Sequence, residues 1–158
     1  MALHFRPFEP GDQAAFRDLN ETWIVQFFAM EPQDYEVLGD PETYILNKGG
    51  HVFMGFDGDE AVACCALLPK ESGCFELGKM AVAEERRGQG IGRKMMEYMI
   101  GQARLIGAKR LYLESNTKLP NAVHIYEAAG FRHLPPERVV PSPYARSNVY
   151  MEMFLESA

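Results

Sequence analysis

The residues best suited to chemistry in this sequence lie in one short stretch, residues 84–92, which reads EERRGQGIG. Gly88, Gly90 and Gly92 occupy every second position, directly after two arginines. Glycine lets a backbone turn sharply and approach a ligand closely, and the start of a helix presents unpaired N–H groups with partial positive charge. The stretch therefore predicts a cradle for a phosphate or pyrophosphate, with a glycine-rich turn that binds nothing as the alternative.

The common nucleotide motifs do not fit this stretch. A Walker loop requires GxxxxGK[ST], but no serine or threonine follows Lys94. A dinucleotide fold requires GxGxxG after its first strand, whereas the pattern here is GxGxG after the fourth expected strand. Arg87, with Arg93 or Lys94, would supply cations at the rim, and Glu84 and Glu85 would partly offset them.

Composition and charge narrow the class of protein. The 158 residues, 47% of them hydrophobic, suit a single domain over 1–158 with one sizeable core. A net charge of −6 without a basic run argues against a nucleic-acid or membrane partner. No signal-like or membrane-spanning apolar run occurs, so we expect a cytoplasmic protein. The three cysteines are expected to be buried thiols, and the scattered histidines predict no metal site.

Hydrophobic periodicity predicts the elements that must position the glycine stretch. Strands are expected over 2–10, over two segments of 51–70 joined at Asp57-Gly58, and over 74–83, 109–115, 131–134 and 147–156. Helices are expected from Asp12, from about Pro41 to Gly49, over 91–106 and over 119–130. The helix from Asp12 would carry Phe16, Leu19, Trp23 and Phe27 on one face, and the helix over 91–106 would carry Ile91, Met95, Met99, Ala103 and Ile106. This order favours a mixed sheet with helices on its faces.

The glycine stretch and its flanks resemble the GCN5-related N-acetyltransferase (GNAT) superfamily. Arg87-Gly88-Gln89-Gly90-Ile91-Gly92 matches the signature [RQ]-x-x-G-x-[GA], and ELGKMAV, LYLESN and NAVHIYEAAGF resemble neighbouring segments in the same order. The resemblance is strong over roughly residues 60–134. It implies an α/β (α+β) fold, with a mainly antiparallel sheet of about seven strands, about four helices, and splayed fourth and fifth strands.

The resemblance implies acetyl-CoA as co-substrate and no metal. The pyrophosphate would be held by the backbone of Arg87, Gly88, Gln89, Gly90, Ile91, Gly92 and Arg93, and the pantetheine arm by the backbone of Met80, Ala81 and Val82. Asn121 would contact the arm, with helix-start capping as the alternative.

Acetyl transfer to an amine needs a base, an oxyanion donor and an acid. Tyr126 is the expected acid for the leaving thiolate, with core packing as the alternative. Glu76 is the expected base, with an exposed strand carboxylate as the alternative, and the N–H of Met80 is the expected oxyanion donor. Strand alternation predicts that Glu76, Gly78, Met80 and Val82 share one face.

The acyl acceptor is the least specified part of the prediction. Trp23, Phe27, Tyr144 and Arg146 are candidate acceptor contacts, with core packing or surface exposure as the alternative. The acceptor would be an amine on a small molecule or peptide, attacked directly in a ternary complex. A non-catalytic acyl-CoA-binding module, and an acyltransferase for longer acyl chains or oxygen acceptors, stay open. Homodimers are common in the family, but no residue here indicates one.

Overall fold

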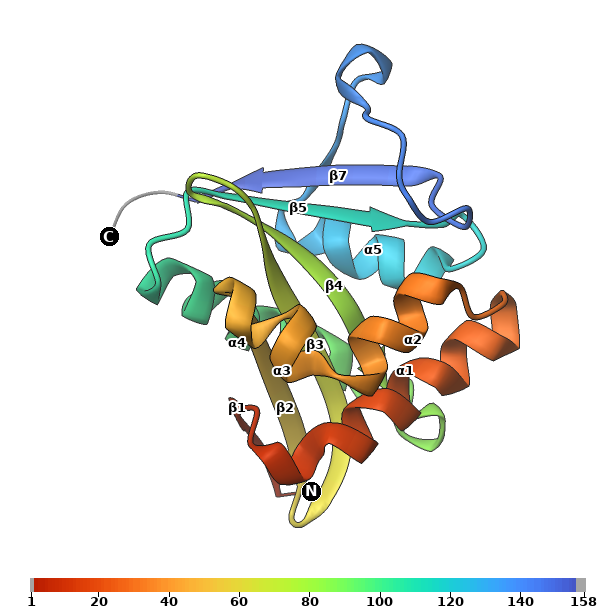
Figure 1. Ribbon diagram of the computed structural model, residues 1–158, viewed down its shortest axis with the longest axis vertical. Helices are drawn as coiled ribbons and strands as arrows, with labels where there is room; N and C mark the ends of the chain where they lie inside the picture. The colour runs from red at the N-terminus through yellow and green to blue at the C-terminus, as the bar shows by residue number, and fades with distance from the viewer. Residues whose placement is uncertain (1, 156–158) are drawn as a thin grey trace.

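The computed structural model describes residues 2–155 and contains one seven-stranded sheet, in the order β1-β2-β3-β4-β5-β7-β6 (Figure 1). The strands are β1 Leu3–Pro7, β2 His51–Asp57, β3 Glu60–Glu71, β4 Cys74–Val82, β5 Arg110–Ser115, β6 Arg132–His133 and β7 Val149–Phe154. All neighbouring pairs are antiparallel except β4 and β5. The predicted mixed sheet and its hairpin at Asp57-Gly58 are confirmed.

The parallel pair is short, and this shortness creates the opening in the sheet. Residues of β4 and β5 pair only from Cys74 opposite Arg110 to Leu77 opposite Leu113. Beyond that point β4 continues to Val82 without a partner from β5, which pairs with β7 on its other side. The predicted splay of the fourth and fifth strands is confirmed.

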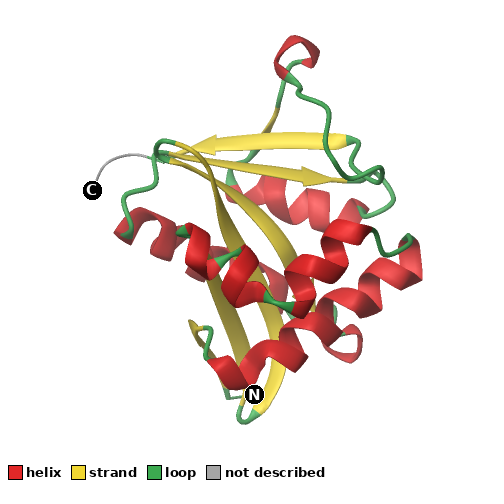
Figure 2. Cartoon of the chain, viewed as in Figure 1, coloured by secondary structure: helices red, strands yellow, loops and turns green. Residues whose placement is uncertain are grey.

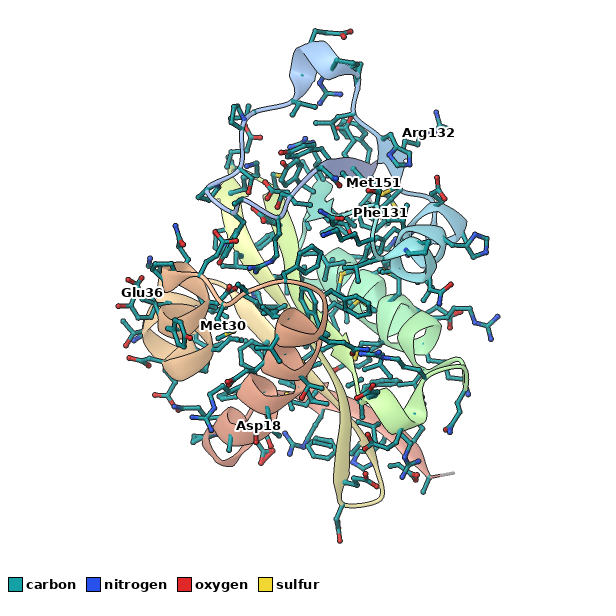
Figure 3. The ribbon with its side chains drawn as sticks, turned by 90° about the vertical axis from the view of Figure 1, so that its right-hand side faces the viewer. Asp18, Met30, Glu36, Phe131, Arg132 and Met151 are labelled. Carbon is teal, nitrogen blue, oxygen red and sulfur yellow. The ribbon has the colours of Figure 1, made fainter. Side chains whose placement is uncertain are left out.

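Helices cover both faces of the sheet (Figure 2). One face carries α1 Gln13–Phe27, α2 Pro32–Gly39 and α3 Pro41–Tyr44, and the other carries α4 Ile91–Leu105 and α5 Pro120–Ala129. The side view in Figure 3 shows the sheet between these two layers, with Met30 and Glu36 among the first group and Phe131 beside the second. The layered α/β architecture follows the prediction.

Several predicted boundaries are corrected. The sequence analysis missed α2, although Pro32 starts it and Glu31 and Asp34 form a capping box there. The helix expected from Pro41 to Gly49 is a single turn, α3, followed by a 3-10 turn. Asp12 precedes α1 but makes no capping bond to it, because its carboxylate bonds Arg6 and the N–H of Glu9 instead. Glu156, at the end of the expected last strand, lies outside the described residues.

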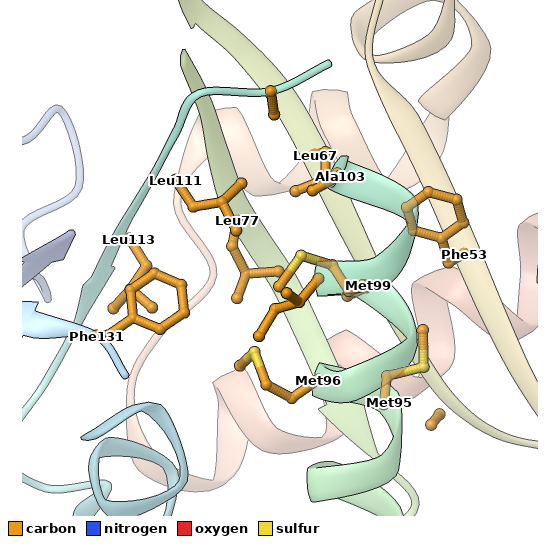
Figure 4. Packing of buried hydrophobic residues seen from close by; sticks show 14 of the residues in the cluster. Phe53, Leu67, Leu77, Met95, Met96, Met99, Ala103, Leu111, Leu113 and Phe131 are labelled. Atoms are coloured by element: carbon orange, nitrogen blue, oxygen red, sulfur yellow. The ribbon is translucent and has the colours of Figure 1, made fainter. Parts of the chain in front are cut away.

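The predicted apolar face of α4 packs on the sheet and forms one of two cores. Ile91, Met95, Met99 and Ala103 are buried as expected, and Figure 4 shows the methionines meeting Phe53, Leu67, Leu77 and Leu111. Ile106 is an exception, since it follows the last helical residue and remains 38% exposed. The second core lies under α1 and α2 around Phe16, Ile24, Leu38 and Met54. The two cores hold the open part of β4 between two rigid layers.

Gly101 offers a test of how much α4 contributes to stability. A Cβ at this helical position would meet no atom within 4 Å. We expect Gly101→Ala to raise the free energy of unfolding by about 0.5–1 kcal/mol, because alanine loses less backbone entropy than glycine on helix formation. Thermal unfolding followed by circular dichroism would show a rise of about 1–4 °C. Gly50→Ala should instead lower the free energy of unfolding, since its Cβ would lie 2.7 Å from the Leu67 carbonyl oxygen.

Candidate active site

A cleft of about 1060 Å³ lies where β4 and β5 separate. Its floor is the unpaired part of β4, from Gly78 to Val82. The glycine stretch, the start of α5, the end of α1 and the segment 140–147 form its walls. The residues predicted to bind the cofactor all line this cleft except Gln89, whose side chain is exposed.

The glycine stretch forms a tight turn into α4. Gly88 and Gly90 adopt φ of +82° and +80°, a region that favours glycine, and a Cβ on either would meet no atom within 4 Å. Gly90 is the N-cap of α4, and its carbonyl accepts the N–H of Lys94 at 3.2 Å. This is the first hydrogen bond of the helix. N–H groups earlier in the first turn have no intrahelical acceptor, and here they belong to Ile91, Gly92 and Arg93. The turn therefore leaves open backbone donors beside the cleft.

The arginines next to the glycines divide into structural and open side chains. Arg86 lies 2.6 Å from Asp57 and 2.6 Å from Glu60, so it ties the turn to the β2–β3 hairpin. Arg87 and Arg93 line the cleft and are exposed, whereas Lys94 does not line it. The exposed cations that line the cleft beside the turn are thus Arg93 and Arg87, which donates to the Gln26 side chain at 3.5 Å.

Glu76 has the environment of a base. It lines the cleft from β4, half-buried, and its carboxylate makes no hydrogen bond or ion pair with any of residues 2–155. Burial raises the pKa of its carboxyl to about 7, and the negative charge of Glu114 adds to this shift. A carboxyl that titrates near neutrality can take up a proton and release it again at physiological pH.

Tyr126 lines the same cleft from α5. Its ring lies 6.1 Å from that of Phe131, edge to face, so it also packs on the core. Burial raises the pKa of its phenol to about 12, which keeps the hydroxyl protonated. Asn121, the second residue of α5, is exposed on the cleft, and its amide makes no hydrogen bond within the described chain. The capping alternative for Asn121 therefore has no support in the structure.

A β-bulge in β4 changes the face of the sheet on which the side chains beyond it lie, compared with the prediction. The register with β3 shifts between Cys64 and Ala66, where both Lys79 and Met80 face the single residue Cys65, and Lys79 adopts φ +51°. Beyond the bulge the two faces exchange, so Met80 and Val82 pack toward α4 with Leu77. The prediction that these two share a face with Glu76 and Gly78 is wrong, because alternation holds only in an unbroken strand.

Lys79, which the sequence analysis did not single out, points toward α2. Its Nζ lies 2.6 Å from Asp34 Oδ1 and donates to the Tyr144 hydroxyl at 3.2 Å. Arg146 binds the same carboxylate through both terminal nitrogens, at 2.7 and 2.6 Å. Asp34 is fully buried, and burial by itself would raise its pKa. The hydrogen bonds from Arg146 and Lys79 outweigh that effect and lower the pKa to about 2.

We call the part of the cleft formed by Glu76, Lys79, Glu114, Tyr144 and Arg146 the acceptor end. The predicted contacts Trp23, Phe27, Tyr144 and Arg146 all line the cleft, and Phe27 is 37% exposed. Glu114 was missed by the sequence analysis. It accepts hydrogen bonds from Tyr112, Ser142 and Ser147, which fix its carboxylate in place. The only local signal for Glu114 was its position near the end of a strand.

None of the three cysteines lines the cleft. Cys64 and Cys65 are fully buried in the sheet, and burial raises the pKa of the Cys64 thiol to about 12. Cys74 borders a separate depression of about 390 Å³ and bonds Arg110 at 3.2 Å. Within residues 2–155 no cluster of histidine, cysteine and carboxylate side chains could hold a metal ion. Across the same residues no helix is long and apolar enough to cross a membrane.

Solved structures share this fold over nearly the whole chain. A GNAT-family acetyltransferase from Staphylococcus aureus Mu50 superposes with a TM-score of 0.87 at 19% identity, covering 98% of this chain and 100% of that one. A spermidine N-acetyltransferase from Vibrio cholerae, solved with CoA and spermine, superposes with a TM-score of 0.74 at 20% identity, covering 97% and 95%. At these identities the likeness establishes the fold.

Curated relatives match a shorter part of the chain. The Escherichia coli K12 protein named uncharacterized N-acetyltransferase YjgM is 34% identical over 95 residues, which cover 57% of this chain and 56% of that protein. N-acetyltransferase 8B of Rattus norvegicus is 30% identical over 96 residues, covering 58% and 43%. The chain thus matches about half the length of these relatives. The profile of the acetyltransferase (GNAT) family matches residues 13–131, from the start of α1 to just past α5. Because this match covers most of the sequence and the fold agrees with it, the chain belongs to the GNAT acetyltransferase family.

Proposed function

We propose that this protein is an acetyl-CoA-dependent N-acetyltransferase, in which a primary amine attacks the acetyl group directly within a ternary complex. One observation carries the proposal. A single cleft along the unpaired part of β4 has the open glycine turn at one end and the unpartnered carboxyl of Glu76 at the other. Such a cleft can accept an extended acyl donor along the strand and an amine at its far end.

The residues present fit acetyl-CoA. Gly88 and Gly90 leave open space beside the backbone donors of the turn, and Arg87 and Arg93 add positive charge for a pyrophosphate. The edge of β4 from Gly78 to Val82 offers unpaired strand positions to the amides of a pantetheine arm. Bound there, acetyl-CoA would supply an acetyl group activated as a thioester.

Glu76 would prepare the amine for attack. An alkylamine has a pKa near 10, so its neutral form costs about 4 kcal/mol at pH 7. Glu76, with its pKa near 7, can take that proton directly or through a water, and the amine nitrogen then becomes nucleophilic. The N–H of Met80, at the bulge in β4, would donate to the oxygen that gains negative charge. This arrangement needs no acyl-cysteine, which agrees with the burial of Cys64 and Cys65.

Tyr126 would donate a hydrogen bond to the departing thiolate, because a phenol with a pKa of about 12 does not transfer its proton fully to a thiolate whose thiol has a pKa near 8.5. We expect Tyr126→Phe to lower kcat by about 10- to 100-fold, a smaller effect than loss of a general base, because a thiolate of pKa near 8.5 leaves without full protonation. The affinity for acetyl-CoA should stay within about 3-fold, since the aromatic ring is retained. Steady-state kinetics and calorimetry on both proteins would check this. An unchanged kcat would remove Tyr126 from the chemistry and leave it a packing residue.

The experiment that tests the proposal combines binding with turnover. Isothermal titration of acetyl-CoA into the protein should give micromolar binding, and a panel of primary amines should release CoA at rates above background. Binding without turnover of any amine would favour a non-catalytic acyl-CoA-binding module. Absence of binding at millimolar acetyl-CoA would refute both readings. The presence of Glu76 and Tyr126 in one cleft is the observation that favours the enzyme.

A further inference from the structure

The pairing of charges at the acceptor end determines which ligand charges it tolerates. Two cations, Lys79 and Arg146, line the cleft there and would ordinarily invite a carboxylate. Both are already bound to Asp34, through three contacts of 2.6 to 2.7 Å, and Arg146 also lies 3.3 Å from Glu31. A ligand carboxylate would have to displace a fully buried partner to reach either cation.

The exposed lysines of the cleft do not replace them. Lys70 is exposed at the edge, with its Nζ 4.4 Å from the centre of the Tyr112 ring. Lys118 is exposed on the α5 side, 5.6 Å from the centre of the Phe28 ring. Exposed charges of this kind are screened by water and salt. The acceptor end therefore offers no desolvated, uncompensated cation among the described residues.

Two carboxylates at the same place form no ion pair within residues 2–155, and the charges of Lys70 and Lys79 act on Glu76 only from a distance. Glu76 pairs in register with Tyr112, and Glu114 lies two residues further along β5, so all three side chains share one face of the sheet. Glu76 has no bonded partner in the described chain, and the partners of Glu114 are the neutral hydroxyls of Tyr112, Ser142 and Ser147. An incoming ligand thus meets negative charge beside the expected base.

The rest of this end is apolar and aromatic. Trp23 of α1, Phe28 directly after α1, Val37 of α2 and Leu68 of β3 line it, and Tyr144 closes it from the segment 140–147. Trp23 and Phe28 pack edge to face at 6.3 Å. Such a wall favours an apolar ligand body. Arg146 already lies over the rings of Trp23 and Tyr144, 5.8 and 4.5 Å from their centres.

From this arrangement we infer the class of acceptor: a primary amine with an apolar body and no carboxylate next to the amine. The inference rests on the proposed function and adds the substrate class. A free amino acid would place its carboxylate within a few ångströms of Glu76 and Glu114, whereas the corresponding amine would bring only a positive charge. The carboxylates of Asp34 and Glu31 would act as a specificity device, because they bind the two cations that could otherwise hold a substrate carboxylate.

A matched series of acceptors tests this inference. 2-Phenylethylamine, phenylalaninamide and phenylalanine share one apolar body, and only phenylalanine carries a carboxylate. We expect kcat/KM with acetyl-CoA to be at least 100-fold higher for phenylethylamine than for phenylalanine. Phenylalaninamide should resemble phenylethylamine, because it fills the space of the carboxylate without the charge. Tryptamine and tryptophan would repeat the comparison with a larger ring.

Two variants then test the cause of the preference. Asp34→Asn should lower the ratio of kcat/KM for phenylethylamine to kcat/KM for phenylalanine at least 10-fold, because it frees Lys79 and Arg146 to bind a carboxylate. Glu114→Gln keeps the size of the side chain and removes one repelling charge, so it should lower the ratio about 5-fold even if Asp34→Asn fails to fold. A lost or distorted fold would reduce both activities together and leave the ratio unchanged.

The outcomes separate this inference from the proposed function. Acetylation of phenylalanine as efficiently as phenylethylamine would overturn the substrate class and leave the acetyltransferase standing. Binding of acetyl-CoA, with neither turnover nor calorimetric binding of phenylethylamine and phenylalaninamide, would also overturn it. A ratio unmoved by both folded variants would refute the role of these charges. A failure to bind acetyl-CoA at all would instead refute the proposed function itself.

Discussion

Replacing Glu76 with glutamine is expected to lower kcat/KM by about 10²- to 10⁴-fold, the usual contribution of a positioned general base. Glutamine keeps the shape of the side chain but cannot accept the proton of the amine. Because Glu76 has no hydrogen-bonded partner within residues 2–155, its replacement leaves no buried donor unsatisfied. The affinity for acetyl-CoA should not change, since the glycine turn that would bind it lies at the other end of the cleft.

The pH dependence gives a second signature of Glu76. Its pKa is raised to about 7, chiefly by burial, so the carboxyl becomes protonated and loses its function as the pH falls through 7. We expect kcat/KM of the wild type to decline about tenfold per pH unit below this value. In Glu76→Gln this inflection should disappear from the residual activity. A wild-type profile with no inflection between pH 6 and 8 would contradict the assignment.

The same substitution should stabilise the fold at alkaline pH. A carboxyl with a raised pKa binds its proton more tightly in the folded state, so its contribution to stability is lost as the pH rises from about 4.5 to about 7. Above pH 7 the ionised carboxylate costs up to about 3 kcal/mol, which glutamine removes. Denaturant unfolding at pH 8 should therefore show a more stable but inactive variant. Glu97→Gln, on the exposed side of α4, is the control and should change neither the stability at pH 8 nor the activity.

Replacing Gly92 with valine is expected to weaken acetyl-CoA binding more than 100-fold. Gly92 lies in the first turn of α4, and its Cβ would stand 3.3 Å from the Ile125 Cδ1 and 3.6 Å from the Val82 Cγ2, at the junction of β4 and α5. A branched side chain there would fill the floor of the cleft and block the close approach of a pyrophosphate to the backbone. Titration calorimetry measures the loss directly.

Gly101→Val is the matched control for this prediction. It makes the same change in the same helix, at a position where a Cβ meets no atom within 4 Å and which does not line the cleft. Both variants therefore gain the same small amount of helix propensity, about 0.3 kcal/mol, because valine forms helices slightly better than glycine. Gly88 and Gly90 are poorer targets, because their positive φ would strain any side chain whether or not a ligand binds. If Gly92→Val binds acetyl-CoA as tightly as Gly101→Val, the glycines serve only as a turn.

The sequence by itself determined the parts of this protein that depend on near neighbours. The glycine stretch sets the turn into α4, because φ of +82° and +80° at Gly88 and Gly90 are local requirements that few other residues meet. The 3.6-residue period of Ile91, Met95, Met99 and Ala103 determines which side of α4 is buried. Strand patterns and turn residues located the sheet, and the motif order indicated the family that the profile match establishes.

Only the tertiary structure decided how the acceptor end is charged. Arg146 and Asp34 are 112 residues apart, and Lys79 is 45 residues from Asp34, so no local pattern joins them. The bulge at Lys79 also reverses the faces of β4, which simple alternation cannot foresee, because a bulge arises from pairing with β3 and not from β4 alone. The helix that carries Asp34 was missed although Pro32 and the capping box mark its start. Its eight residues are too few to be stable alone, and packing on α1 and the β-sheet holds them in place.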